Sequence, residues 1–226
     1  MNIKNISNKI KKTWDWIWHS DSIWSWIVAL IIVYAFIKLI FFPGLSLITG
    51  SSLPFAGVES SSMDHQIVKD DYGILGLCDR FYNEETKERT DSFDKYWEIC
   101  GSWYEQRNIT KEQFSKFALK DGFKKGDIIF SWGRFEPKIG DIIIFKQNPE
   151  SNAPRPIIHR IISIDEQGII QTKGDHNAKQ LTVSNNIYKT DETHITKDKI
   201  IGKAILRIPL LGWPKIWLTE LINAFR

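Results

Sequence analysis

Three consecutive serines precede a methionine in the segment GVESSSMDHQ, residues 57–66. A serine hydroxyl attacks a peptide bond only when a base removes its proton and hydrogen-bond donors stabilise the oxyanion. Beyond the apolar N-terminal region, the candidate bases are several lysines and the histidines His65, His159, His176 and His194. These residue types allow serine-based hydrolysis, and the elements that carry each base must decide which one serves the serine.

His159 stands among isoleucines on a predicted strand, in the sequence IIHRII. Strand propensity alone would place another isoleucine or valine there. The alternative to a catalytic role for His159 is a structural one, in which the half-buried ring donates a hydrogen bond to a backbone carbonyl. His65 lies only three residues from Ser62. Side chains so close in an extended chain rarely point together, so we expect His65 to be a polar turn residue. His194, in the polar sequence TDETHITKD, is expected to be solvated.

Five short, isoleucine-rich segments are predicted to form the sheet that carries these residues. Each is bounded by Gly, Pro, Asn or Asp, as antiparallel strands of a sheet or barrel should be. They cover residues 126–132, 139–147, 155–164, 168–175 and 199–208. Gly-Asp pairs at 126–127 and 140–141 open two of them, where glycine allows the turn and aspartate caps it. The expected fold class is therefore mainly β.

Residues 66–124 have a different pattern and are predicted to be a mostly helical insertion ahead of the main sheet. One stretch carries apolar residues at helical spacing, namely Phe93, Tyr96, Trp97 and Cys100. We interpret this aromatic stripe as packing rather than as a ligand site. A second stretch opens with Thr110 and Gln113 as a capping box and closes at Gly122.

The only two cysteines, Cys78 and Cys100, lie in this insertion. Two cysteines form neither a disulfide framework nor a zinc-ligand cluster. A single bridge between them is allowed in an oxidising compartment, and the sequence leaves open whether it forms. Asn108-Ile109-Thr110 is an N-glycosylation sequon, a triplet that is also common by chance.

Residues 23–42, IWSWIVALIIVYAFIKLIFF, are apolar except for Ser25, Tyr34 and Lys38. A helix of this length spans roughly 30 Å, the thickness of the hydrocarbon core of a bilayer. The alternative is a removable secretory signal. However, no A-x-A-like cleavage site follows, and the apolar run exceeds the roughly 7–15 residues of a signal core. We therefore predict an uncleaved membrane anchor.

Flanking charge predicts the orientation of this anchor. Four lysines precede it, and after Lys38 no Lys or Arg occurs until Lys69. The positive-inside rule then leaves residues 1–22 in the cytoplasm and places residues 43–212 outside as the catalytic domain. Residues 213–226 are predicted to be an interfacial helix. The tryptophans near the start of the anchor fit an interfacial belt. The net charge of +3 is too weak to argue for nucleic acid.

Five sequence segments occur in an order that resembles type I signal peptidases: ESSSMDH, GDIIIFKQ, IIHRIISI, TKGDHNA and IIGKAILRIPLLG. These are membrane-anchored serine endopeptidases that remove signal peptides from secreted preproteins. The resemblance covers roughly residues 20–65 and 124–212, and the helical insertion lies outside it. Histidine directly before the arginine, as in His159-Arg160, is similar to the Ser/His branch of archaea and the endoplasmic reticulum. We expect the archaeal form.

The resemblance implies a role for individual residues. Ser62, directly before the methionine, corresponds to the nucleophile, and His159 corresponds to the base. The Ser62 N–H, with help from the Ser60 hydroxyl, would hold the oxyanion. Asp175 in TKGD is expected to orient the histidine or to support the hydrogen bonding of the site.

The sequence departs from the family pattern in two places. Relatives commonly carry a proline two residues after the methionine. In this chain Asp64 and His65 follow Met63, so His65 takes the place of that proline and the turn loses a fixed φ. Many Ser/His members have a second aspartate six residues after the first. Leu181 stands there in this chain, and the nearest acid downstream is Asp191. The identity of the acidic third member is therefore open.

No metal or organic cofactor is implied. The implied partners are preproteins with signal peptides and the lipid bilayer of the cell membrane, crossed once, and contact with the protein translocation machinery is allowed. Three alternatives remain: Lys146 or Lys173 as the base, a self-cleaving repressor of the related Ser/Lys fold, and an anchored peptide-binding module without activity. The repressor would need a DNA-binding module, whereas this chain carries an apolar helix.

Overall fold

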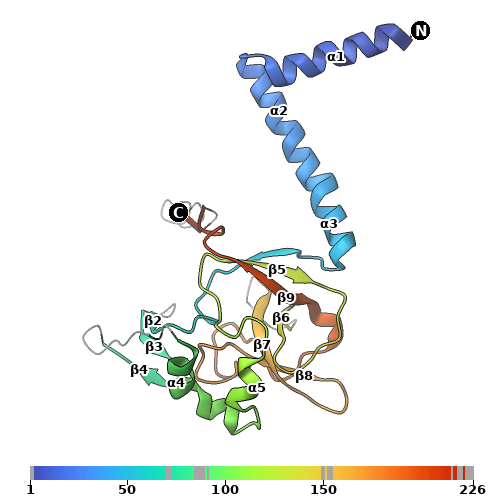
Figure 1. Cartoon of the computed structure of the whole chain (residues 1–226). Coiled ribbons are helices and arrows are strands. Elements are labelled where there is room, and N and C mark those ends of the chain that lie inside the picture. Colours follow the sequence, from blue (N-terminus) through green and yellow to red (C-terminus); the bar gives the residue numbers. More distant parts are fainter. Residues whose placement is uncertain are drawn as a thin grey trace. The chain divides into compact units, whose positions relative to one another are not determined.

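The computed structural model describes residues 3–69, 73–83, 90, 92–148, 151, 155–214, 216–217 and 221 (Figure 1). The chain divides into two compact units, Met1–Ile48 and Thr49–Arg226.

The first unit is helical. It contains α1 (Ile3–His19), α2 (Ile23–Phe36), a π-helical turn (Ile37–Phe41) and the start of α3 (Phe42–Thr49). Residues Ile23–Thr49 form a continuous helical segment, and its most apolar 18-residue window has a mean hydropathy of 2.4 and is only 6% buried. In the part of the chain that the structure describes, this one helix is long and apolar enough to cross a membrane. It contains the predicted span 23–42 and continues beyond it.

The π-helical turn has a local cause. Pro43 has no N–H to continue the helical ladder, so it is tolerated only near the first turn of a helix. Just before it, the Phe42 N–H bonds the carbonyl of Ile37, five residues back, instead of the usual fourth. The apolar helix thereby passes the proline without a break.

The second unit is organised around a six-stranded antiparallel sheet. The five predicted strands are all present, and β1 is added to them. The order across the sheet is β1 (Phe55–Gly57), β5 (Ile128–Trp132), β9 (Ile200–Ile208), β6 (Ile142–Phe145), β7 (Ile157–Ile164) and β8 (Ile170–Lys173). All four residues of β6 are buried because the strand lies in the middle of the sheet, between β9 and β7. A fold class that is mainly antiparallel β is confirmed.

The two Gly-Asp pairs form the turns that lead into β5 and β6, as predicted. Gly126 and Gly140 have φ values of 92° and 93°, a region that favours glycine. The next residues, Asp127 and Asp141, each accept the amide of the lysine three positions earlier, at 2.8 and 3.1 Å. Each aspartate also pairs with a basic side chain of β9, which ties the turn to the sheet.

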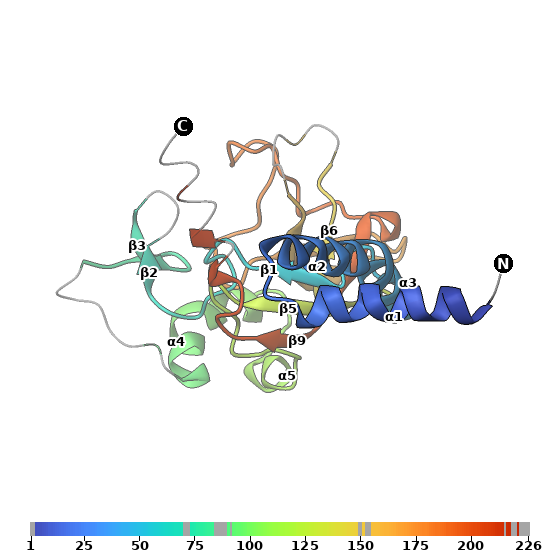
Figure 2. The same cartoon turned by 90° about the horizontal axis from the view of Figure 1, so that it is seen from above.

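The insertion contains the two expected helices, α4 (Phe93–Glu105) and α5 (Lys111–Ser115), and the capping box of α5 is formed. However, α5 ends at Ser115 rather than at the expected Gly122, and the two helices are the smaller part of residues 66–124, so the expectation of a mostly helical insertion is wrong. The insertion also contains a small antiparallel sheet that the sequence did not predict: β2 (Val68–Lys69), β3 (Leu75–Leu77) and β4 (Arg80–Phe81). Strands of two or three residues are too short to give a periodic signal. Figures 1 and 2 both show this sheet beside α4, and the aromatic residues of α4 pack in one cluster with Leu75, Leu77 and Ile162 of β7.

Cys78 and Cys100 form a disulfide that joins the turn after β3 to α4, which answers the question left open by the sequence. Of the predicted interfacial helix 213–226, the described residues Trp213, Pro214, Ile216, Trp217 and Leu221 are helical. The other positions of that prediction lie outside the described residues.

Candidate active site

The structure brings together two residues that are 97 positions apart in the sequence. Ser62 lies in the turn that follows β1, and His159 lies on β7, opposite Ile143 of β6. The Ser62 Oγ is 2.9 Å from the His159 Nε2, within hydrogen-bond distance. His159 is 3% exposed and Ser62 is half-buried, so the imidazole is shielded while the hydroxyl stays accessible.

The turn that carries Ser62 is fixed by its neighbours. The Ser62 carbonyl accepts the amide of His176 at 2.9 Å, and the Met63 carbonyl accepts the amide of Phe123 at 3.0 Å. The Met63 side chain is 1% exposed, and its sulfur accepts the Asp175 N–H at 3.3 Å. The methionine after the serine is therefore a buried anchor for the turn.

The other ring nitrogen of His159 contacts Glu192. His159 Nδ1 and Glu192 Oε1 form a short hydrogen bond, and Glu192 is fully buried. The same oxygen accepts the Thr172 hydroxyl at 3.0 Å, and Oε2 accepts the Leu181 amide at 2.7 Å. Several donors thus hold this carboxylate in place, as a group that orients a histidine requires.

The expected contact between Asp175 and His159 is absent among the described residues. Asp175 instead accepts hydrogen bonds from the Arg160 guanidinium, the shortest at 2.7 Å, from the Tyr104 hydroxyl at 3.0 Å and from the His65 ring at 3.1 Å. The reason is strand geometry: consecutive side chains of β7 point to opposite faces, so a carboxylate that pairs with Arg160 lies on the wrong face for His159.

Asp175 is nevertheless a strongly held anion. Burial by itself raises the pKa of this carboxyl, but the Arg160 charge and the hydrogen bonds from His65 and Arg160 outweigh burial. The resulting pKa lies well below the usual range of an aspartate. Arg160 is also fully buried, and its remaining N–H groups donate to the carbonyls of Ala118, Leu119 and Gly140. Both charges of this buried pair are therefore satisfied.

Sequence reasoning did not identify Glu192 as the partner of His159, because the second aspartate of the family corresponds to position 181. In this chain Leu181 stands there, and only its backbone amide takes part, as a donor to Glu192. The carboxylate comes from the segment that runs along the outer edge of β8, where the Glu192 carbonyl accepts the Thr172 amide at 2.9 Å. The sequence feature that could have pointed to Glu192 is the pair of adjacent acidic residues in TDETH. The first of these acids, Asp191, caps the next turn by bonding the amide and hydroxyl of Thr193 at 2.9 and 2.6 Å.

The prediction that His65 is a polar turn residue is wrong, whereas the expectation that it does not serve Ser62 agrees with its contacts. His65 is 4% exposed, its ring stacks on Tyr96 with centroids 3.6 Å apart, and its Nε2 bonds Asp175. Its Nδ1 is buried and has no partner among the described residues. Burial lowers the pKa of His65, so the ring is neutral and donates from Nε2. His194 is exposed, as expected.

Two hydrogen-bond donors lie close to the Ser62 hydroxyl. The Ser60 Oγ lies 3.2 Å from the Ser62 Oγ. The Ser62 backbone N–H has no hydrogen-bond acceptor within the described ranges. An N–H without an acceptor and a neighbouring hydroxyl are the kinds of donor that an oxyanion requires.

Gly174 allows the chain to approach the Ser62–His159 pair closely. A Cβ at this position would lie 2.7 Å from the Ser62 carbonyl oxygen and 2.8 Å from the His159 Nε2. Only glycine fits between these atoms without moving them. The close packing of TKGD against the pair is therefore a steric requirement of the site.

Neither lysine considered as a base contacts Ser62 in the described part of the chain. Lys173 is fully buried, its Nζ donates to the Gly174 carbonyl at 2.9 Å, and it faces the rings of Trp103 and Tyr104. Burial lowers the pKa of this amine to about 8. Lys146 is exposed.

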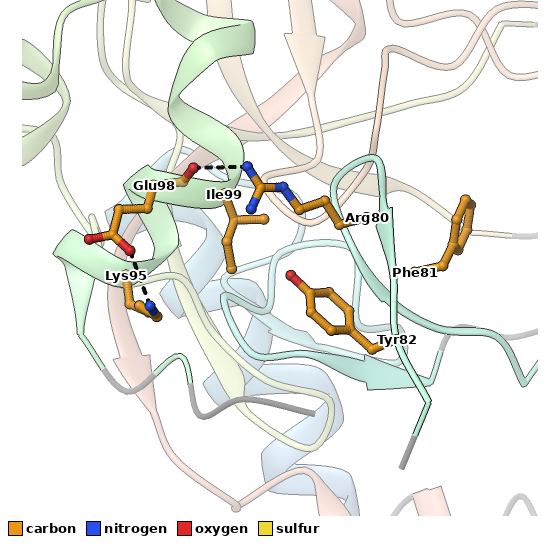
Figure 3. Close-up of a pocket in the computed structure, with 6 residues that line it drawn as sticks. All are labelled: Arg80, Phe81, Tyr82, Lys95, Glu98 and Ile99. Carbon is orange, nitrogen blue, oxygen red and sulfur yellow. Dashed lines mark hydrogen bonds and ion pairs between the residues drawn. The ribbon is translucent and has the colours of Figure 1, made fainter. Parts of the chain in front are cut away.

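A cavity of about 460 Å³ lies in the insertion, between β4 and α4 (Figure 3). Its walls are formed by Arg80, Phe81, Tyr82, Lys95, Glu98 and Ile99. Arg80 donates to the Glu98 carbonyl at 3.3 Å across it, and Lys95 pairs with the Glu98 carboxylate at 3.2 Å. It contains neither Ser62 nor His159, so it is distinct from the site described above.

Comparison with known proteins shows where this chain has relatives. No family model matches the chain. The signal peptidase complex catalytic subunit of Lachancea thermotolerans is 34% identical over 112 residues, which is 46% of this chain and 62% of that protein. The corresponding subunits of Pyricularia oryzae and Zygosaccharomyces rouxii are each 29% identical over 109 residues, again 46% of this chain and 60% and 62% of those proteins.

The matched region thus spans about three fifths of the length of these curated relatives. All three are fungal, so the comparison gives no support to the archaeal form that we expected. Over about half of its length this chain is thus similar in sequence to the catalytic subunits of signal peptidase complexes, and its mainly antiparallel sheet with an N-terminal apolar helix is consistent with a signal-peptidase-like fold.

Proposed function

We propose that this chain is a membrane-anchored serine endopeptidase that removes signal peptides from preproteins. The observation that carries the proposal is the 2.9 Å hydrogen bond between the Ser62 Oγ and the His159 Nε2. The similarity to signal peptidase catalytic subunits supports the same conclusion.

In the proposed reaction, His159 takes the proton of Ser62 as the oxygen attacks the scissile carbonyl carbon. The Ser62 N–H and the Ser60 hydroxyl stabilise the oxyanion of the tetrahedral intermediate. His159 then gives the proton to the leaving amine, and the C–N bond breaks. Water, activated by the same histidine, hydrolyses the acyl-enzyme and releases Ser62.

We propose Glu192, in place of Asp175, as the carboxylate that positions His159. Its short contact with Nδ1 fixes the tautomer that leaves Nε2 free to accept the serine proton. Its negative charge also stabilises the imidazolium that forms during attack. Asp175 then supports the site indirectly, through the loop that follows β8.

The preprotein is proposed to bind as an added strand beside β1. This edge strand pairs with β5 on one side, and no described strand pairs with its other side. β1 leads directly into the turn that carries Ser62, so an added strand would bring its carbonyls to the hydroxyl. The family resemblance implies small residues at the first and third positions before the cut.

The apolar helix is proposed to hold this domain at the outer surface of the membrane, with the lysine-rich N-terminus in the cytoplasm. Signal peptides are themselves membrane-inserted, so anchoring places enzyme and substrate at the same surface. The relatives are named as subunits of a complex, and we propose that this chain also works with further subunits.

Cleavage of a test preprotein by the full chain in liposomes tests this function. The wild type is expected to release the signal peptide, and Ser62→Ala is expected to release none. His159→Ala should lower kcat by about 1,000-fold or more, because the serine loses its base. Ser61→Ala, one residue from the nucleophile and outside the proposed machinery, is the matched control and should retain activity.

Cleavage by Ser62→Ala would overturn the proposal. Activity that survives His159→Ala and is lost in Lys173→Met would show a lysine base instead. Binding of the preprotein by the wild type without any product would identify an inactive peptide-binding module.

A further inference from the structure

The insertion meets the proposed catalytic region at Asp175, through two tyrosines of α4. Tyr96 and Tyr104 are both fully buried and lie a little more than two helical turns apart. The Tyr96 hydroxyl donates to the Asp175 carbonyl at 3.0 Å, and the Tyr104 hydroxyl donates to the Asp175 carboxylate at 3.0 Å. Each hydroxyl has one proton, so the 3.3 Å contact between the two hydroxyl oxygens is secondary.

The electrostatics keep both tyrosines as donors. Burial, followed by the Asp175 charge, raises the pKa of Tyr96 and of Tyr104 well above the usual value of a phenol. The two hydroxyls therefore stay protonated throughout the working pH range and can always donate to Asp175.

The segment held by these tyrosines in turn holds the nucleophile. The His176 N–H, one residue beyond Asp175, donates to the carbonyl of Ser62 itself at 2.9 Å. The Asp175 N–H bonds the sulfur of Met63, and Gly174 fits against Ser62 and His159 with no room for a Cβ. A shift of this loop would therefore change the distance between the Ser62 Oγ and the His159 Nε2.

Other parts of the insertion clamp the same loop. The Cys78 amide donates to the His176 carbonyl at 2.8 Å, and the Cys78–Cys100 disulfide connects this contact to α4. His65 stacks on Tyr96 while it bonds the Asp175 carboxylate. The loop 174–177 thus lies between the insertion on one side and the Ser62–His159 pair on the other.

We propose that α4 is a positioning element for the catalytic pair, and that Tyr96 and Tyr104 act through Asp175 to set the geometry of Ser62. This inference rests on the proposed function. It gives the insertion, which lies outside the family resemblance, a role in the rate of the chemical step. Tyrosine is required rather than phenylalanine, because both rings would pack equally well in the aromatic cluster but only a hydroxyl reaches Asp175.

The test compares Tyr96→Phe, Tyr104→Phe and the double variant with the wild type in the preprotein assay, well below their melting temperatures. Because a displacement of about 1 Å can cost about 100-fold in rate, we expect kcat to fall about 10-fold in each single variant and up to about 100-fold in the double variant. KM should stay within about twofold, since neither tyrosine is placed at the substrate edge of β1. Tyr188→Phe, the same change at a side chain that is 49% exposed, should match the wild type.

A second measurement does not depend on activity. Hydrogen exchange of the loop 174–177, followed by mass spectrometry of the full chain, should become about 10-fold faster in the double variant and stay unchanged in Tyr188→Phe. If the double variant does not fold, the two single variants give the same comparison.

The outcomes separate the two proposals. Cleavage by the wild type but not by Ser62→Ala supports the proposed function, and wild-type kcat in the tyrosine variants then overturns this inference alone. A change in KM without a change in kcat also overturns it. If the wild type does not cleave, the proposed function fails, and unchanged loop protection in the double variant overturns the positioning role as well.

Discussion

At the scale of residues, two neighbours on β7 select two different carboxylates. His159 and Arg160 are consecutive, so their side chains emerge on opposite faces of the strand. Glu192 lies on the face of His159, and Asp175 lies on the face of Arg160. One acid thus contacts the proposed base, and the other closes a buried ion pair that also binds His65 and Tyr104.

Glu192→Gln is expected to lower kcat by about 100-fold or more while the protein stays folded. The amide keeps the size of the side chain but loses the charge that holds the Nδ1–H and stabilises the imidazolium. Kinetics in the preprotein assay, with the melting temperature as a check on folding, measure the effect. Glu136→Gln, at an exposed glutamate that pairs with Lys197 on the surface, is the control and should match the wild type. Wild-type kcat in Glu192→Gln would rule out the assigned role.

At the scale of elements, the Ile-rich strands and the Gly-Asp turns follow from local sequence, whereas the insertion depends on contacts across the fold. Helix α4 buries one aromatic face against β3 and β7. The disulfide then fixes this helix to the turn after β3, whose Cys78 amide bonds the loop beside the catalytic pair. Covalent closure of the insertion should therefore contribute to the stability of the whole second unit.

The double variant Cys78→Ala/Cys100→Ala is expected to lose about 3 kcal/mol of unfolding free energy. The disulfide joins residues 22 positions apart. Closing a loop of this size lowers the conformational entropy of the unfolded chain, which corresponds to about 3 kcal/mol of stability. Guanidinium unfolding of the chain in detergent measures the change. The wild type treated with a reductant should unfold at the same midpoint as the variant. An unchanged midpoint in both would show that the bridge does not stabilise this unit.

At the scale of the whole molecule, an apolar helix precedes a domain whose interior holds several ionisable groups. His65, with Asp175, Arg160, Asp64 and the Tyr96 ring around it, is the buried histidine packed directly on α4. Burial is the largest effect and lowers the pKa of His65, although the hydrogen bond and the negative charge of Asp175 act in the opposite direction. Burial also lowers the pKa of His176. As the pH falls, the unfolded state therefore binds protons at these two histidines before the folded state does.

Stability is expected to fall as the pH falls below about 6.5, the ordinary pKa of histidine, and to keep falling until the pH passes the lowered pKa of the folded state. The stability contributed by Asp175, whose pKa is depressed, is present above about pH 3.9 and is lost only below it. Between pH 7 and about pH 5 the buried histidines lower the stability as the pH falls. Burial raises the pKa of the Asp64 carboxyl, so this group acts in the opposite direction, because the folded state takes up its proton more readily than the unfolded state does.

His65→Gln should reduce this slope by up to about 1.4 kcal/mol per pH unit, because one proton linkage is removed. The glutamine keeps a donor for Asp175 but cannot be protonated. Melting temperatures from pH 7 to pH 5 measure the slope, and His194→Gln, at an exposed histidine, serves as the control. An unchanged slope in His65→Gln would show that His65 is already charged in the folded chain.

The sequence by itself determined the features that depend on short-range pattern. The apolar run marked the helix that is long and apolar enough to cross a membrane, the isoleucine-rich segments marked five strands of the sheet, and the Gly-Asp pairs marked two turns. Ser62 and His159 were singled out by the resemblance to signal peptidases. A histidine among isoleucines contradicts strand propensity, but the residues alone left a structural histidine open. Three-residue β1 and the small sheet of the insertion were too short for such a signal.

Only the tertiary structure decided which groups surround that pair. Glu192 reaches His159 because its segment runs along the edge of β8, and nothing in the local sequence sets that register. His65 is buried because α4 covers it, although its neighbours are polar. Asp175 faces Arg160 because alternate residues of β7 face opposite sides. In each case the contact joins segments far apart in the chain, so long-range packing rather than local propensity chose the partner.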